Sequence, residues 1–488
     1  DFLELQRAFQ RHWVVQAAAQ EQRVFLLREV LAPADDLRLQ CQHRLQPGRL
    51  LGRHGHEAGA AGEAGRQHGL ADTRPAKGKD AKWQWGPDEQ HAFELMKKII
   101  AAVAAALTIS ALVTAPVSAF DPLRVSTVFS KLAADPKLKN PSVILIDAST
   151  SEVIFESNSY AMRKPASTLK LLAGVSVARY LDPEMRFQTS LALAEQPNSV
   201  VIQGDMDPWA TFSASNAERL GQTSLKYLAY RAHVELEAQA GAPVKKMTIY
   251  YNGIYDSEAT NMKVYLKSRK VYAIVKPVSA LEAQRLISEP VMNSISPSVH
   301  QMTHFFLQWS DNVLSERLSR IAAKAAGFSS NAEGIAAVYK QVLSEMEIDS
   351  SKLVVKDGSG LSHDNRLTAH LLGELLVRIH KDPQYAAIVE SLPDGGINGT
   401  LNERFLDTAP QAVGLVHAKT GTLNGTVSLA GFVESGDREY IFVVIADKLS
   451  RSYSATELAR DTLDRYLGKV AAPLQIITES ATVSSITP

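Results

Sequence analysis

Three short motifs stand in one order along this chain of 488 residues, and they constrain its fold more than any other feature. They are Ser167-Thr168-Leu169-Lys170, Ser310-Asp311-Asn312 and Lys419-Thr420-Gly421. Each motif is weak alone, because short patterns of this kind recur by chance. Together they require a fold that brings three distant segments to one place, where they would form a serine acyl-transfer site without a histidine.

The first motif places Ser167 and Lys170 at the start of a predicted helix. Pro165 is favoured in a first helical turn, and an apolar stretch follows the motif. Residues three apart share a helix face, so the Lys170 amine would lie near the Ser167 hydroxyl. Lys170 can take the serine proton only when neutral, which requires burial or a nearby second cation, and Lys419 is the candidate cation. The alternative is an amphipathic helix that happens to carry these two residues.

The second motif lies between two apolar stretches, which predicts a helix junction with polar side chains turned into a cleft. Ser310 would relay a proton to the leaving amine, and the Asn312 amide would hold a substrate carbonyl. The alternative is an N-cap, in which Ser310 or Asp311 opens the helix that follows. The two roles are compatible, and we expect Asp311 to be the structural member.

The third motif precedes a clear β-hairpin pattern. On a strand edge, Lys419, Thr420 and Thr422 would offer a cation and two hydroxyl donors to a substrate carboxylate. Gly421 would let the substrate backbone approach closely. The backbone N–H groups of Thr422 and Ser167 would form an oxyanion hole. The alternative is an edge-strand lysine that discourages aggregation.

With these motifs the chain resembles the D-alanyl-D-alanine carboxypeptidase/endopeptidases, the class C low-molecular-mass penicillin-binding proteins, over roughly residues 120 to 470. The likeness extends to residues 164–172, to Asp357-Gly358-Ser359-Gly360-Leu361-Ser362 and to residues 418–425. It implies an α+β fold of the serine β-lactamase and transpeptidase type, an antiparallel sheet flanked by helices. The distance between the first two motifs leaves room for one inserted subdomain, whereas large members of the family carry more than one.

The resemblance implies a serine-type D-Ala-D-Ala carboxypeptidase, with endopeptidase activity left open, which needs no cofactor or metal. Its partners would be peptidoglycan stem peptides and, as covalent inhibitors, β-lactam antibiotics. Neutral Lys170 would activate Ser167 for attack on the peptide carbonyl, Ser310 would pass a proton to the departing amine, and water would hydrolyse the acyl-enzyme. The catalytic set is then Ser167, Lys170, Ser310, Asn312 and Lys419. The substrate-binding set is Thr420, Gly421 and Thr422.

Two other functions compete with this interpretation. A class A β-lactamase would need an added glutamate for deacylation, and no Glu-x-x-Leu-Asn string follows Ser310. A non-catalytic cell-wall binding protein would have lost motif residues, and none is lost. Outside the motifs, His417 is best explained by packing, and the Asp357–Gly360 string by a tight turn. Arg404 or Arg366 would meet a peptidoglycan carboxylate, and the sequence does not choose between them.

Residues 1–95 have an unusual composition. They contain no Ser, Ile, Asn, Tyr or Met, and residues 1–76 carry ten Arg and no Lys. Neither a folded domain nor a linker commonly has this bias, which is typical of a GC-rich gene read in a wrong frame. We therefore expect residues 1–95 to be non-native, disordered upstream sequence joined to the protein at Met96. The alternative is a genuine cytoplasmic tail rich in Arg and Gln.

Residues 96–119 have the pattern of a secretory signal peptide. Two lysines precede an apolar segment, and small residues lead to Ala119. An uncleaved membrane anchor is the alternative, which Pro116 and the weak hydrophobicity disfavour. Cleavage after Ala119 would deliver the protein to the cell wall or periplasm. The single cysteine, Cys41, precedes this segment, so the mature chain would need no disulfide.

The remaining sequence is long enough for a large core and a subdomain. We expect a peptidase domain over residues 120–186 and 289–470, an inserted subdomain over residues 187–288, and a tail over residues 471–488. The 52 basic and 52 acidic residues balance, and no basic patch indicates a nucleic-acid partner.

Overall fold

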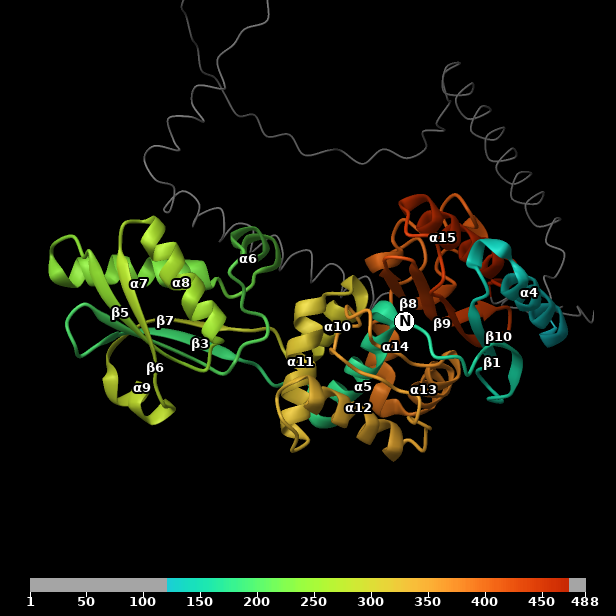
Figure 1. Ribbon diagram of the computed structural model, residues 1–488, viewed down its shortest axis with the longest axis horizontal. Helices are drawn as coiled ribbons and strands as arrows, with labels where there is room; N and C mark the ends of the chain where they lie inside the picture. Colours follow the sequence, from blue (N-terminus) through green and yellow to red (C-terminus); the bar gives the residue numbers. More distant parts are fainter. Residues whose placement is uncertain (1–120, 474–488) are drawn as a thin grey trace, which may run out of the picture. The chain divides into compact units, whose positions relative to one another are not determined.

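The structure is a computed structural model that describes residues 121–473 (Figure 1). The unusual upstream segment and the signal peptide expected from the sequence lie outside the described residues, as does most of the expected C-terminal tail. The described residues fold around two separate five-stranded sheets. This arrangement confirms the α+β class expected from the sequence, and the second sheet lies in the segment where we expected an inserted subdomain.

The first sheet is antiparallel throughout and has the strand order β2-β1-β10-β9-β8. Its strands are β1 (Ser142–Asp147), β2 (Val153–Ser157), β8 (Val416–Leu423), β9 (Thr426–Ser435) and β10 (Arg438–Ala446). β8, β9 and β10 form a meander that contains the predicted hairpin. β1 pairs with β10 from Ser142↔Ile445 to Asp147↔Tyr440, so the first and last parts of the domain share one sheet.

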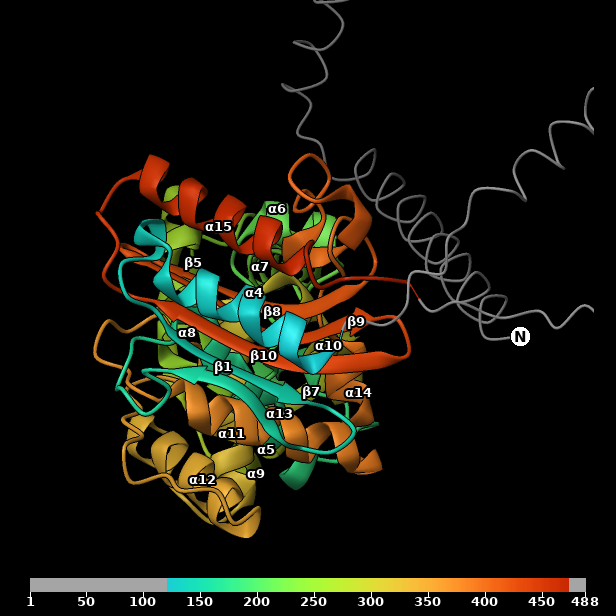
Figure 2. The same ribbon diagram turned by 90° about the vertical axis from the view of Figure 1, so that its right-hand side faces the viewer.

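Helices cover both faces of this sheet (Figure 2). On one face lie α4 (Pro122–Ala134) and α15 (Tyr453–Leu467), which bury Val143 and Leu145 of β1. Ile144 and Ile146 point to the other face, because successive strand residues alternate between the two sides. The helices with residues in that second core are α5 (Lys170–Tyr180), α10 (Val299–Trp309), α11 (Asn312–Ala325), α12 (Ala332–Glu345), α13 (Ala369–Lys381) and α14 (Ala386–Glu390).

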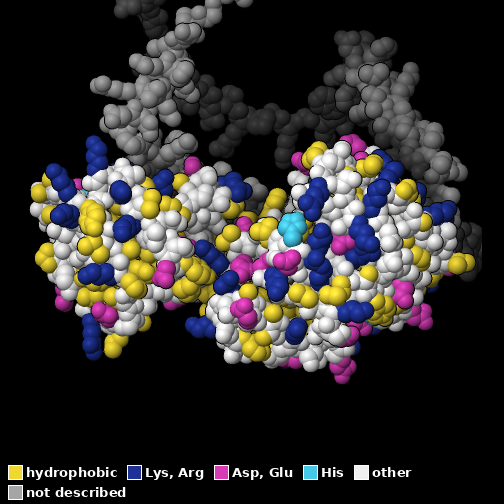
Figure 3. Space-filling view, viewed as in Figure 1, with side chains coloured by type: hydrophobic (Ala, Val, Ile, Leu, Met, Phe, Trp, Pro, Cys, Tyr) yellow, Lys and Arg dark blue, Asp and Glu magenta, His cyan; other side chains and the backbone are white. Residues whose placement is uncertain are grey.

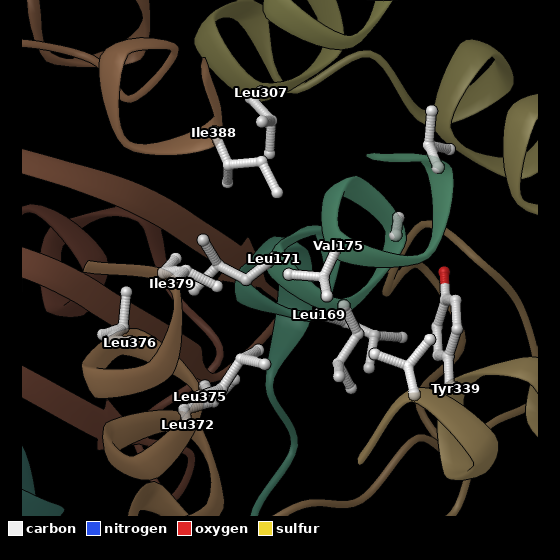
Figure 4. Close-up of a cluster of buried hydrophobic side chains, with 14 of the residues drawn as sticks. Leu169, Leu171, Val175, Leu307, Tyr339, Leu372, Leu375, Leu376, Ile379 and Ile388 are labelled. Carbon is white, nitrogen blue, oxygen red and sulfur yellow. The ribbon is translucent and has the colours of Figure 1, made fainter. Parts of the chain in front are cut away.

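Helix α5 is the centre of the second core. Every residue from Lys170 to Val177 is buried, which is the pattern of a helix surrounded by protein on all sides. Figure 4 shows Leu171 and Val175 of α5 among side chains from the surrounding helices, including Leu307 of α10 and Leu376 of α13. The packing fixes the position of α5, and with it the first motif.

The second sheet has the order β6-β5-β4-β3-β7. Its strands are β3 (Gln188–Ala194), β4 (Ser199–Gly204), β5 (Lys246–Asn252), β6 (Tyr272–Pro277) and β7 (Ile287–Ile295). β4, β5 and β6 are parallel, whereas β3 pairs antiparallel with β4 and β7. The helices of this subdomain are α6 (Ala214–Leu220), α7 (Leu225–Ala240), α8 (Asp256–Ser268) and α9 (Ala280–Leu286). β7 continues to Ile295, beyond the subdomain boundary that we expected at residue 288, and none of the residues of this edge strand is fully buried.

Short 3-10 helices complete the fold: η1 (Pro136–Leu138), η2 (Ala166–Leu169), η3 (Pro383–Tyr385), η4 (Gly399–Leu401) and η5 (Pro410–Ala412). On the face shown in Figure 3, basic, acidic and hydrophobic side chains are interspersed. None of the helices between residues 121 and 473 is long and apolar enough to cross a bilayer.

Candidate active site

Ser167 lies in η2, so the helical turn expected around it is a 3-10 turn that leads into α5. The chain enters this turn at Ala166 with φ at 50°, a left-handed conformation that is strained for alanine. Two hydroxyl groups anchor the entrance by donating to the Pro165 carbonyl, Ser428 of β9 at 2.6 Å and Thr168 at 2.7 Å. The strained turn is therefore held from the neighbouring strand.

Lys170 begins α5 and is fully buried. Its Nζ lies 2.9 Å from the Ser167 hydroxyl, 2.7 Å from the Asn312 amide oxygen and 2.6 Å from the Ser359 carbonyl. Burial lowers the pKa of the Lys170 amine to about 7, against the opposing effects of Asp311 and Asp357. The first and second motifs thus meet at this amine, as the sequence predicts.

The second motif forms the junction between α10 and α11. Ser310 ends α10 in a left-handed conformation with φ at 60°. Asp311 caps α11 by accepting a hydrogen bond from the Leu314 N–H at 2.8 Å, which is the structural role expected for it. Asn312 is the first residue of α11. Because its amide oxygen accepts from Lys170, its amide N–H₂ group is directed to other partners.

The third motif lies on β8. Lys419 is fully buried, and its Nζ donates to the Thr420 carbonyl at 3.2 Å. Burial lowers the pKa of Lys419 well below its usual value, and the nearby charge of Lys170 lowers it further. For Lys170 itself burial is the leading cause of the lowered pKa, and burial is one of the two causes expected from the sequence.

Gly421 packs against the nucleophile turn. A side chain there would collide with the Ser428 hydroxyl and would lie 3.0 Å from the Ser167 nitrogen. From the sequence we expected Gly421 to let the substrate backbone approach closely. In the structure, the space that a side chain would fill is occupied by the Ser428 hydroxyl and the backbone of the nucleophile turn. Strand β8 can consequently lie directly beside Ser167, with Thr422 one residue further along the strand.

The Asp357–Ser362 loop contributes a contact that sequence reasoning missed. The Asp357 carboxylate accepts from the N–H groups of Ser359 at 2.8 Å, Gly360 at 2.6 Å and Ser362 at 2.6 Å. Burial would raise the pKa of Asp357, but these hydrogen bonds hold it below its usual value. Gly360, with φ at 85°, packs on the Ala166 carbonyl, where any Cβ would collide. The loop is a tight turn, as predicted, and it also presents the Ser359 carbonyl to Lys170.

The three residues weighed outside the motifs have structural partners. His417 lies between Asp394 at 2.6 Å and Glu434 at 3.1 Å. Burial would lower the pKa of His417, but these two carboxylates raise it to about 9. Arg404 forms a buried ion pair with Asp464. Arg366 donates to the carbonyls of His363 and Asn365.

A groove of about 620 Å³ borders the site, because Asn312 and Ser359 are among its lining residues. Tyr255 of the inserted subdomain and Arg317 and Arg320 of α11 also line it. A larger cavity of about 870 Å³ lies elsewhere, against α13, and none of the motif residues line it. Between residues 121 and 473, no group of three or more His, Cys, Asp or Glu side chains is arranged to hold a metal ion.

The sequence profile of the D-Ala-D-Ala carboxypeptidase 3 (S13) family matches residues 125–227 and 275–470. Among curated relatives, Carboxypeptidase DacB of Mycolicibacterium smegmatis is 27% identical over 372 residues, which cover 66% of this chain and 79% of that protein. The D-alanyl-D-alanine carboxypeptidase of Actinomadura sp. strain R39 is 32% identical over 164 residues, covering 32% of this chain and 30% of that protein.

The fold is also that of solved penicillin-binding proteins. Penicillin binding protein 4 (dacB) of Haemophilus influenzae superposes with a TM-score of 0.54 at 16% identity, covering 69% of this chain and 98% of that one. A second structure of that protein, complexed with a novel β-lactam, gives a TM-score of 0.53 at 17% identity, with the same coverage. These likenesses confirm the fold inferred from the motifs. Since the family profile matches more than half of the sequence, this chain belongs to the D-Ala-D-Ala carboxypeptidase 3 (S13) family.

Proposed function

We propose that this protein is a serine-type D-Ala-D-Ala carboxypeptidase of the cell wall, with Ser167 as its nucleophile, and that penicillin acylates the same serine. The observation that carries the proposal is the set of three contacts made by the buried Lys170 amine. This set supports a lysine base directed at one hydroxyl.

The chemistry of the three partners sets the direction of proton transfer. The Asn312 amide oxygen and the Ser359 carbonyl can only accept hydrogen bonds. A neutral amine has two N–H donors and one lone pair, so these two acceptors use both donors. The lone pair is then left for the third partner, the Ser167 hydroxyl at 2.9 Å. Neutral Lys170 would therefore take the serine proton.

The same geometry supports the attack that follows. Ser167 would add to the carbonyl carbon of the D-Ala-D-Ala peptide bond, and the carbonyl oxygen would become an oxyanion. The backbone N–H groups of Ser167 and Thr422 would stabilise it, and the close packing of Gly421 on the Ser167 nitrogen supports their proximity. The Asn312 N–H₂ group would hold a substrate carbonyl.

The remaining motif residues would act on the leaving amine and on the terminal carboxylate of the substrate. Ser310 would pass a proton to the departing D-Ala amine, with Lys419 nearby. Thr420 and Thr422 would donate to the terminal carboxylate of the substrate. A carboxylate would also favour the charged form of Lys419, which burial disfavours in the free enzyme. One proton would then reside on Lys419 and leave Lys170 neutral. Water would complete the cycle by hydrolysing the acyl-enzyme.

The known relatives support the substrate and the location. Two of these relatives are named carboxypeptidase and D-alanyl-D-alanine carboxypeptidase, and a solved structure of the same fold is complexed with a β-lactam. D-Ala-D-Ala ends occur on peptidoglycan stem peptides, so we place the reaction outside the cytoplasm. Export would use the signal peptide expected over residues 96–119.

Covalent labelling tests this function. We expect penicillin to add its mass to the wild-type protein and to label the peptide that contains Ser167. Ser167→Ala should abolish the label without a change in thermal stability. The control is Ser329→Ala, in the exposed string Ser329-Ser330-Asn331, which repeats the Ser-x-Asn pattern of the second motif; this variant should label normally. Label on another residue would refute the site. Rapid loss of the label would favour a β-lactamase, and no label in the wild type would favour a non-catalytic binding protein.

A further inference from the structure

The hydroxyl of Thr422 has a partner that the motifs do not contain. Arg460 of α15 donates from Nη2 to the Thr422 Oγ1 at 2.9 Å. A hydroxyl has one proton to donate. Because its oxygen accepts from a guanidinium, that proton points away from Arg460 and is free to serve another acceptor. The ion pair with Glu457, at 2.6 Å from Nη1, fixes the other end of the guanidinium.

Arg460 has N–H donors that its protein partners do not use, and its side chain is partly exposed to solvent. A guanidinium has five N–H groups in a planar fork, more than the contacts to Thr422 and Glu457 use. Its side chain is 31% exposed, in contrast to that of Lys419, which is fully buried. Arginine also keeps its charge at every physiological pH. It is therefore an accessible and permanent cation next to the third motif.

The surface is hollowed at this point. A cavity of about 290 Å³ is lined by Thr422 at the end of β8, by Asn424 and Arg451 in the adjoining loops, and by Tyr453 and Arg460 of α15. It is one residue along the strand from Gly421, which packs on the Ser167 nitrogen. An anionic group bound at the β8 edge would lie beside this cavity. Arg366 and Arg404, the arginines first considered for this role, already have protein partners.

We propose that Arg460 is a specificity-determining residue for the terminal carboxylate of the substrate, acting as a positioning residue through Thr422. It holds the Thr422 hydroxyl with its proton turned to the carboxylate, and it places a permanent positive charge beside the carboxylate. This inference rests on the proposed function and deepens it, because it assigns the recognition of a free C-terminus to a residue on α15. Glu457 restrains the guanidinium before the substrate arrives.

The test compares a charged ligand with its neutral counterpart. We expect Arg460→Gln to lower the second-order rate of Ser167 acylation by penicillin about tenfold, since a charge-assisted contact at a partly exposed site is lost. The rate with the methyl ester of the same penicillin should not change, so the acid-to-ester ratio should fall about tenfold. Arg460→Lys should restore part of the ratio, because it keeps the charge and loses the planar fork.

Two further variants make the result decisive. Arg465→Gln on the same helix, which removes the guanidinium paired with Asp461 at 3.5 Å, should leave the ratio unchanged. Thr422→Val should lower the ratio, and adding Arg460→Gln to it should have a smaller effect than in the wild type. An unchanged acid-to-ester ratio in Arg460→Gln, or equal effects in the two backgrounds, would overturn the proposal. Failure of wild-type Ser167 to react with either ligand would instead overturn the proposed function.

Discussion

The inserted subdomain and the motif-bearing site bury charge in different ways. In the subdomain, Glu258 of α8 is buried and pairs with Arg317 of α11 at 2.6 Å. The same guanidinium donates to the Ala210 carbonyl at 2.8 Å, so the ion pair ties the subdomain to the helix that begins at Asn312. At the site, Lys170 and Lys419 are fully buried, and the hydrogen bonds of their amines go to neutral oxygens.

The difference separates structural charge from functional charge. A buried ion pair is neutral as a unit, and breaking it leaves one charge stranded. A buried amine bonded to neutral oxygens has a lowered pKa, which is useful to a base and costly to stability. The fold tolerates two such amines because α5 and β8 are fixed by packing around them. The comparison predicts that removing a buried amine at the site will lower the acylation rate but not the stability. Removing a partner of the buried ion pair will lower the stability but not the acylation rate.

Lys170→Met tests the site half of the comparison and should have the largest effect. We expect acylation by penicillin to fall at least about a thousandfold, because the base is lost. That loss equals about 4 kcal/mol of transition-state stabilisation. The free energy of unfolding should rise, since an amine buried against its preferred charge state is replaced by an apolar side chain of similar length. Acylation rates and denaturant unfolding measure the two quantities.

Lys131→Met, on the exposed side of α4, serves as the control and should change neither quantity. A Lys170→Met variant that is much less stable than the wild type would contradict the comparison, because it would make Lys170 a structural residue.

Arg317→Met tests the other half. We expect the free energy of unfolding to fall by about 3 kcal/mol, because Glu258 would be left buried without its partner. Acylation per folded molecule should stay within a fewfold of the wild type, since Arg317 makes no contact with the Lys170 amine. The double variant with Glu258→Gln should recover much of the stability. A large loss of acylation with unchanged stability would show that this ion pair belongs to the chemistry.

Much of this arrangement could be predicted from the sequence. The apolar run after Ser167 predicted a helix, the strand composition on both sides of a turn after Lys419 predicted the hairpin, and the order of the motifs predicted their convergence. These features could be predicted because they follow directly from the identity and spacing of the side chains. The capping role of Asp311 could be predicted for the same reason.

Other features of the structure have no pattern in the sequence from which they could be predicted. The contact of Lys170 with the Ser359 carbonyl uses a backbone atom, which every residue has. The 3-10 turn at Ser167 depends on its anchor to Ser428, more than 260 positions away in the sequence. The subdomain boundary was expected inside β7, because no residue of this edge strand is fully buried and its composition gives no strong strand signal. Arg460 lies on a partly exposed side of α15, and its position in the helix pattern does not show that it reaches Thr422.

The last prediction concerns Lys419, where the two buried amines influence each other. We expect Lys419→Ala to lower acylation by penicillin and by D-Ala-D-Ala peptide at least about a hundredfold, or about 2.7 kcal/mol, because support for the oxyanion and the carboxylate is lost. Stability should change little. The rate in the wild type should rise with pH through about 7, as Lys170 loses its proton.

The pH profile of this variant tests whether a charge on Lys419 adds to burial in lowering the pKa of Lys170. Any charge on Lys419 disfavours a second charge on Lys170, so its removal should let Lys170 hold its proton to higher pH. The midpoint of the rise in rate with pH, at which Lys170 loses its proton, should therefore shift to higher pH. It should remain well below the usual lysine value of 10.5, because burial is the leading cause of the shift and is retained. An unchanged midpoint would assign the low pKa of Lys170 to burial alone and would leave Lys419 a role only in binding the substrate. Equal rates for wild type and variant at every pH would remove Lys419 from the site and undo the contrast between the two regions.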